Sequence, residues 1–188
     1  GDFIVTPPWT WHDHGNDGND PVMWLDGLDL PLVSFLRAGF REDYEASNQF
    51  PRNGNADQVF DRFANALLPL EHRHSGQTSP IFNYPYTRTR EVLERLACHS
   101  DIDACHGVHV RYANPLTGGW AMPTIAASMR LIPKGHTTDF FQSVDGTVLV
   151  GMEGELSVEI EGAGHFVIGP NDVFSVPGWS RWRMKAGS

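Results

Sequence analysis

The fold is decided by residues 1–16, which read GDFIVTPPWTWHDHGN, and by residues 22–29, which read VMWLDGLD. Both stretches are predicted to be strands, joined by a loop rich in turn-forming residues. Because side chains alternate between the two faces of a strand, His12 and His14 are predicted to point the same way, together with Thr10. Two imidazoles would then converge on one side of a sheet. A single histidine between aromatic residues is more often a hydrogen-bonded core residue than a metal ligand.

Composition limits the class of protein. The chain has 188 residues, of which 40% are hydrophobic and 20% charged, so it is globular and long enough for one domain or one and a half. Its net charge of −9 argues against binding to nucleic acid or to an anionic membrane. Cys98 and Cys105 are the two cysteines, and we expect both to be reduced thiols in a cytoplasmic protein.

The middle of the chain differs from its end. Residues 37–107 are largely polar and are predicted to form a connector with one helix at 87–97, where Val92, Leu93, Leu96 and Ala97 make an apolar stripe and Thr87 or Thr89 caps the start. Prolines keep residues 78–86 extended, for packing or for docking at a barrel mouth or a subunit contact. After the connector, short strands separated by glycine-rich turns predict a sandwich or barrel. They are expected at residues 108–112, 125–132, 146–152, 156–160, 165–168 and 173–177.

An internal repeat relates the two ends of the chain. Residues 171–182, NDVFSVPGWSRW, align with residues 1–12 without a gap, and the aspartate, proline and tryptophan of the two copies coincide. Similarity at matching positions indicates a duplicated unit. Where the first copy has His12, the second has Trp182, whose indole nitrogen donates a hydrogen bond and does not bind a cation.

The first copy resembles a motif of the cupin barrel, G-x5-P-x-G-x2-H-x3-N. Gly1, Pro7, His12 and Asn16 match it, with Trp9 in place of the middle glycine. In cupins that histidine binds metal, so the resemblance makes His12 the candidate ligand. The other cupin motif, G-x5-H-x-H-x3-E-x6-G, falls on Gly135, Phe141, Ser143, Thr147 and Gly154, where both glycines remain and all three ligands are replaced. We therefore expect an all-β bicupin whose second barrel holds no metal.

Several segments together resemble one family of enzymes. They are residues 6–16, 24–29, 78–96, 114–119 and 122–124, and they are similar to gentisate 1,2-dioxygenases and to the related salicylate and 1-hydroxy-2-naphthoate dioxygenases. The resemblance implies a homotetrameric bicupin with Fe(II) held by three histidines in the first barrel. One ligand is His12, and the other two are expected upstream of Gly1, so the chain is expected to be an N-terminally truncated piece.

The resemblance also implies a division of the chain and a reaction. Residues 1–36 would close the iron-binding barrel, 37–107 would connect, and 108–188 would form the second barrel. Gentisate would be cleaved between its carboxylate- and hydroxyl-bearing carbons to give maleylpyruvate, with dioxygen as the other substrate. A salicylate or 1-hydroxy-2-naphthoate dioxygenase would share these residues, and a non-enzymatic binding or structural cupin is the other alternative.

Two residues near His12 are candidate catalytic groups. His14 is placed to donate a hydrogen bond or move a proton to the substrate. Asp26, a charge within an apolar strand, would orient an imidazole or the substrate hydroxyl.

The remaining histidines carry no such expectation. His72 and His74 have ligand-like spacing but are predicted to lie in an exposed loop, His136 is expected to be exposed, and His99, His106, His109 and His165 show no pairing pattern. Because half of the first barrel is expected to be absent, Phe3, Val5, Trp24 and Leu28 should be uncovered, and the chain should self-associate.

Overall fold

The computed structural model describes residues 1–16, 18–46, 57–64, 68, 70–71 and 76–187. These residues form two compact units. The C-terminal unit comprises Gly1, Pro85–Val110 and Ser128–Ser188, and the N-terminal unit comprises Asp2–Tyr84 and Arg111–Ala127. Among the described residues, helices are too short or too polar to cross a membrane. His72 and His74 lie outside the described residues.

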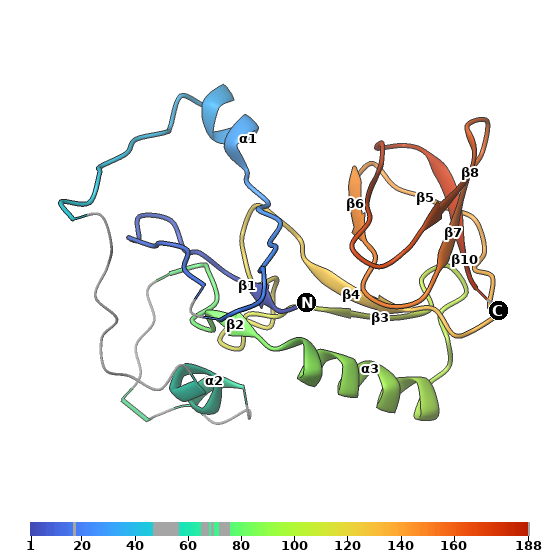
Figure 1. Cartoon of the computed structure of the whole chain (residues 1–188), viewed down its shortest axis with the longest axis horizontal. Helices are drawn as coiled ribbons and strands as arrows, with labels where there is room; N and C mark the ends of the chain where they lie inside the picture. Colours follow the sequence, from blue (N-terminus) through green and yellow to red (C-terminus); the bar gives the residue numbers. More distant parts are fainter. Residues whose placement is uncertain (17, 47–56, 65–67, 69, 72–75, 188) are drawn as a thin grey trace. The chain divides into compact units, whose positions relative to one another are not determined.

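The C-terminal unit is built mainly from antiparallel strands (Figure 1). One sheet has the order β5-β10-β7-β8, formed by Phe141–Gln142, Arg181–Ala186, Leu156–Ile160 and Gly164–Ile168. A second pairs β6 (Thr147–Val150) with β9 (Val173–Val176), and a third pairs β3 (Val108–Arg111) with β4 (Ser128–Leu131). Inward-facing side chains of β7 to β10 make the core, which contains Val158, Ile160, Ile168, Val176, Trp182 and Met184.

The predicted strands after the connector are confirmed, with shorter bounds at several ends. Two strands after the connector were not predicted. β5 has only two residues. β10 alternates buried Trp182 and Met184 with Arg181, Arg183 and Lys185, but its first residues were interpreted only as part of the repeat. The glycines that bracket the second cupin-like motif have a conformational reason to remain, because Gly135 and Gly154 have φ of 72° and 71°, where an L side chain is strained.

Helix α3 (Tyr86–His99) confirms the helix predicted at residues 87–97. It begins one residue earlier than predicted and ends two residues later. Pro85 stands at its N-cap position, so neither threonine caps it; Thr89 instead donates a hydrogen bond from Oγ1 to the Pro85 carbonyl at 3.2 Å. Leu93 is the buried residue of the apolar stripe, and α3 packs against β4.

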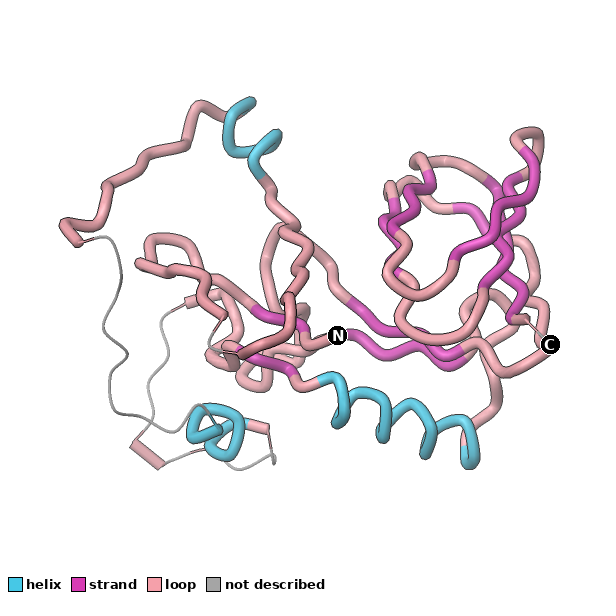
Figure 2. Tube along the Cα trace, viewed as in Figure 1, coloured by secondary structure: helices cyan, strands magenta, loops and turns pink. Residues whose placement is uncertain are grey.

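The N-terminal unit contains little regular structure (Figure 2). β1 (Phe3–Ile4) pairs with β2 (Asn83–Tyr84), and two short helices, α1 (Leu30–Phe35) and α2 (Asp57–Phe63), follow β1 along the chain. The α2 helix lies in the predicted connector, for which one helix was expected. The segment 78–86 is largely extended as far as Pro85, where helix α3 follows. Ser79, Ile81 and Tyr84 are buried, in agreement with a packing role.

Of the strand predicted within residues 1–16 only β1 (Phe3–Ile4) is formed, and the strand predicted at 22–29 is not formed. Pro7 and Pro8 have no backbone N–H to donate, and Trp9 adopts a left-handed φ of 59°, which ends an extended run. The expected exposure is also partly wrong. Val5 is fully buried and Phe3 stacks on Tyr112 with ring centroids 4.4 Å apart, whereas Trp24 and Leu28 are exposed as expected.

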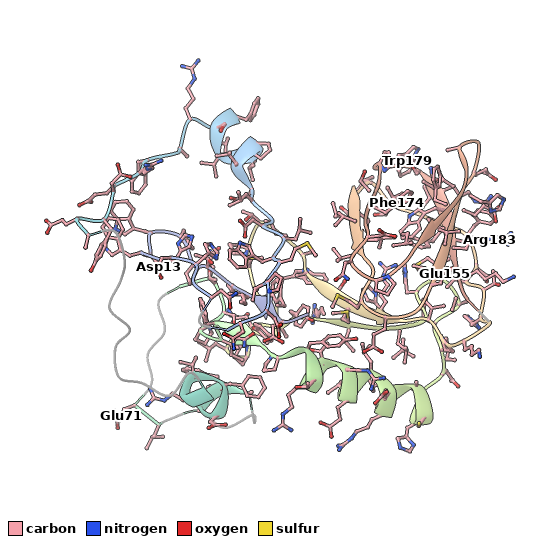
Figure 3. All side chains as sticks on the ribbon, viewed as in Figure 1. Asp13, Glu71, Glu155, Phe174, Trp179 and Arg183 are labelled. Atoms are coloured by element: carbon pink, nitrogen blue, oxygen red, sulfur yellow. The ribbon has the colours of Figure 1, made fainter. Side chains whose placement is uncertain are left out.

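The two copies of the repeat share a local conformation. β1 and β9 occupy equivalent positions, and a turn follows each strand. Trp9 and Trp179, at φ of 59° and 66°, are the third residues of the turns that begin at Pro7 and Pro177. The Trp179 backbone N–H donates to the Ser143 carbonyl at 2.7 Å, and the Trp179 carbonyl accepts from Gln142 Nε2 at 2.6 Å (Trp179 is labelled in Figure 3). These bonds hold a tryptophan in a conformation that glycine usually adopts.

Candidate functional site

The structure brings His12 and His14 together in the N-terminal unit. Their ring centroids are 5.7 Å apart and the rings meet edge to face. His12 Nδ1 lies 3.3 Å from the Thr10 carbonyl oxygen. Because a carbonyl only accepts hydrogen bonds, Nδ1 is the donor, and Nε2 retains the lone pair that binds a metal ion. Both side chains are exposed.

Aromatic contacts position the residues on either side of the two histidines. His14 stacks on Trp24, with centroids 5.0 Å apart and planes at 14°. Trp9 instead contacts Phe40 at 4.5 Å, and Trp11 contacts Tyr44 at 5.3 Å. The two tryptophans therefore have different neighbours from the two histidines, as expected for alternating residues, although no strand forms here. The turn before them is tied by Thr10 Oγ1, which donates to the Pro7 carbonyl at 2.6 Å.

Asp26 is not joined to either histidine in the described part of the chain. It is exposed, and no hydrogen bond or ion pair links its carboxylate to His12 or His14. Asp29 makes the longer-range contact: its Oδ2 accepts a hydrogen bond from Thr124 Oγ1 at 2.7 Å. This bond explains why Asp29, at the N-cap position of α1, makes no side-chain capping bond.

The repeat places two buried side chains at the positions that correspond to His12 and His14. These are Trp182 and Met184 on β10, which are 2% and 1% exposed. Both project into the core of the C-terminal unit.

The described residues do not fit a complete metal site. They include no group of three or more His, Cys, Asp or Glu side chains that could hold a metal ion. His12 offers one imidazole nitrogen of the correct tautomer, and a protein site for iron or zinc needs about three such ligands.

A pocket of about 420 Å³ lies within the N-terminal unit, beside the turn that precedes the histidines. Its volume falls in the range that holds a small molecule. The lining is mainly apolar and contains neither histidine nor Asp26. It consists of Pro7, Pro8, Gly76, Gln77, Thr78, Ser79, Pro80, Phe82 and Pro123.

Sequence reasoning missed a cluster of charged and titratable residues in the C-terminal unit. His106 and His109 have ring centroids 5.6 Å apart, so the two imidazoles are neighbours. His109 Nε2 accepts from Ser128 Oγ at 2.8 Å and from Arg130 Nε at 3.3 Å. Burial and the Arg130 charge lower the pKa of His109 to about 4, and the same two causes lower the pKa of His106. His136 is half-buried rather than exposed. No local spacing marks these residues, because β3 and β4 bring them together.

No family model matches the chain. Known proteins nevertheless resemble it along its whole length. A gentisate 1,2-dioxygenase from Aquipseudomonas alcaligenes is 43% identical over 188 residues, which are 100% of this chain and 54% of that protein. A 1-hydroxy-2-naphthoate 1,2-dioxygenase from a Nocardioides species is 33% identical over 97% of this chain and 46% of its own length.

Solved structures extend the likeness to the fold. A salicylate 1,2-dioxygenase from Pseudoaminobacter salicylatoxidans, solved as its adduct with gentisate, has a TM-score of 0.84 and 29% identity. The match covers 99% of this chain and 52% of that one. The chain thus spans about half the length of the proteins it matches.

Proposed function

We infer that the chain belongs to the gentisate 1,2-dioxygenase group of ring-cleaving dioxygenases and supplies about half of such an enzyme. The observation that carries this inference is 43% identity to a gentisate 1,2-dioxygenase over all 188 residues. The match covers the whole chain, so it includes the segments that carry His12, His14 and Asp26. The likeness to a salicylate 1,2-dioxygenase adduct supports the same class of aromatic hydroxy-acid substrate.

The reaction that we propose for the whole protein is the opening of the gentisate ring. Both atoms of dioxygen enter the substrate between the carboxylate- and hydroxyl-bearing carbons, and the product is maleylpyruvate. Fe(II), when bound, supplies a centre on which the substrate and dioxygen meet. The described residues provide one ligand for it, so the complete site needs donors beyond them.

His12 is proposed to hold the iron through Nε2. The hydrogen bond from its Nδ1 to the Thr10 carbonyl keeps the ring in the tautomer that leaves Nε2 free to bind. His14 is proposed to donate a hydrogen bond or a proton to the substrate, and its stacking on Trp24 limits rotation of its ring. Asp26 is proposed to orient one of these groups once the site is complete.

The finer architecture is proposed from the repeat. Residues 1–36 would belong to an iron-binding cupin barrel, 37–107 to a connector, and 108–188 to a second barrel without metal, which together make a bicupin. This division is supported by the mostly β structure and by the similar turns after β1 and β9, in which Trp9 and Trp179 both have a positive φ. The homotetramer and the cytoplasmic location remain predictions.

Two other substrates have specific support. Salicylate is suggested by the solved neighbour and 1-hydroxy-2-naphthoate by a relative at 33% identity. The test is oxygen uptake by the polypeptide of the intact reading frame, loaded with Fe(II) and supplied separately with gentisate, salicylate and 1-hydroxy-2-naphthoate. We expect the highest kcat/KM with gentisate. Uptake with none of the three would instead favour a non-enzymatic cupin.

A further inference from the structure

Two of the residues that replace metal ligands in the second copy meet in space. Phe141 stands at the first ligand position of one cupin-like motif, and Trp182 stands at the position of His12. They are register partners on β5 and β10, and their ring centroids are 4.5 Å apart. The two motifs thus converge in the C-terminal unit, as they do where ligands surround a metal ion, although neither side chain binds one.

A cation of the protein lies beside these two rings. The central guanidinium carbon of Arg130, on β4, is 5.7 Å from the Phe141 centroid and 5.8 Å from the Trp182 centroid. Its NH1 also approaches the sulfur of Met184, the counterpart of His14, at 3.9 Å. Three of the positions that match ligand or catalytic positions of the cupin-like motifs, those of Phe141, Trp182 and Met184, therefore lie near the same guanidinium.

The surroundings of Arg130 are unusual for a charged side chain. Among the described residues it forms no direct ion pair with a carboxylate; the charge of Asp103 acts on it from a greater distance, and its Nε donates a hydrogen bond to His109 Nε2 at 3.3 Å. The side chain is partly buried. Aromatic faces attract cations, and a guanidinium is weakly hydrated, so the rings can hold Arg130 without a directly bonded carboxylate.

We propose that the guanidinium of Arg130 takes the place of the metal ion in the second copy, as a built-in cation that Phe141 and Trp182 hold through their ring faces. This inference rests on the repeat and does not depend on the substrate of the enzyme. It explains how a barrel that lost its ligands keeps a positive charge at the same place. A divalent cation would meet a fixed positive charge there.

The test is a double-mutant cycle in the 188-residue chain, followed by denaturant unfolding. Arg130→Met keeps much of the side-chain length and removes the charge, and Phe141→Leu keeps an apolar group and removes the ring. If the ring holds the cation, Phe141→Leu lowers the folding equilibrium constant about fivefold more when Arg130 is present than when it is methionine. Equal effects in the two backgrounds would overturn the proposal.

A matched pair controls for cation–ring contact at the surface. Arg181 lies over Phe140 at 4.8 Å but is exposed and ion-paired with Glu161, so the Arg181→Met and Phe140→Leu cycle should show a smaller coupling. If Arg130→Met does not fold, Arg130→Lys replaces it. The ammonium keeps the charge and loses the planar stacking, so the effect of Phe141→Leu should be reduced but not abolished, and an effect equal to that with Arg130 would contradict the proposal.

Discussion

At the scale of the residue, one hydrogen bond decides which nitrogen of His12 is available. The Thr10 carbonyl accepts from Nδ1, and Nε2 is left to bind a metal ion. His14, two residues later, has a different neighbour, the Trp24 ring. The two imidazoles are close, yet their surroundings differ, in keeping with the different roles that we propose for them.

Substitution of each histidine in the polypeptide of the intact reading frame should separate these roles. His12→Ala should abolish iron retention, because one of about three ligands is lost. His14→Ala should keep iron and lower turnover by at least about 100-fold, because a hydrogen-bond or proton donor is lost. Iron content and oxygen uptake measure the two effects. His165→Ala, on exposed β8, is the control and should match the parent; full turnover in both site variants would refute the assignment.

The His109 imidazole makes stability depend on pH. Its pKa of about 4 in the folded chain lies below the ordinary value of 6.5, so the unfolded chain takes up this proton first as the pH falls. Stability should be complete above about pH 6.5 and decrease as the pH is lowered towards 4, and the lowered pKa of His106 acts in the same direction.

Urea midpoints measured between pH 7.5 and 4.5 would test this prediction. His109→Asn should flatten the decrease, because asparagine does not titrate. His99→Gln, at the exposed end of α3, serves as the control and should leave the curve unchanged. A curve for His109→Asn that follows the parent would show that this residue does not cause the dependence.

The sequence indicates some of these residue-scale features and not others. The closeness of His12 and His14 was predictable, because residues two apart in an extended segment share a side. The contacts of Arg130 with His109, Phe141, Trp182 and Met184 were not predictable. These residues come from β3, β4, β5 and β10, and the pairing of distant strands brings them together. The role predicted for Asp26 assumed that residues 22–29 form a strand, and that strand does not form.

At the scale of the element, periodicity identifies segments that bury one face. The strands from residue 108 onward and helix α3 were predicted because their apolar residues repeat every two or every 3.6 positions. Strands were also predicted within residues 1–16 and at 22–29, but beyond β1 no described segment pairs with them. A strand needs a hydrogen-bonding partner, which its own sequence does not supply.

The burial of α3 gives a direct test at this scale. Leu93→Ala should lower the free energy of unfolding by about 2–4 kcal/mol, because it opens a cavity where α3 packs. Val92→Ala is the matched control; because Val92 is 48% exposed, its loss should cost less than about 1 kcal/mol. Denaturant unfolding at pH 7.5 measures both. Equal losses would mean that Leu93 is not the anchor of the helix.

At the scale of the whole molecule, large apolar side chains are exposed in the N-terminal unit. Met23 is 79% exposed, Leu28 72% and Phe35 83%. Exposed apolar surface of this kind promotes association. The burial of Val5 and Phe3 shows that part of the unit covers itself, which the sequence did not predict.

The isolated 188-residue chain is therefore expected to self-associate. In sedimentation velocity experiments, its mean sedimentation coefficient should rise with protein concentration. Met23→Lys combined with Leu28→Lys should reduce that rise by placing charges in the apolar surface. Val144→Lys, at an exposed position of the C-terminal unit, is the control and should leave it unchanged. A parent chain that is monomeric at every concentration would contradict the expectation.

The path of the backbone through the two units has a consequence for dissecting the gene. The chain enters the C-terminal unit at Pro85, leaves it after Val110, and returns at Ser128. A fragment that starts at residue 108 would lack α3, and the face of β4 on which the helix packs would be bare. Expression of the C-terminal unit alone should therefore succeed from residue 85, with Arg111–Ala127 replaced by a short linker, and fail from residue 108.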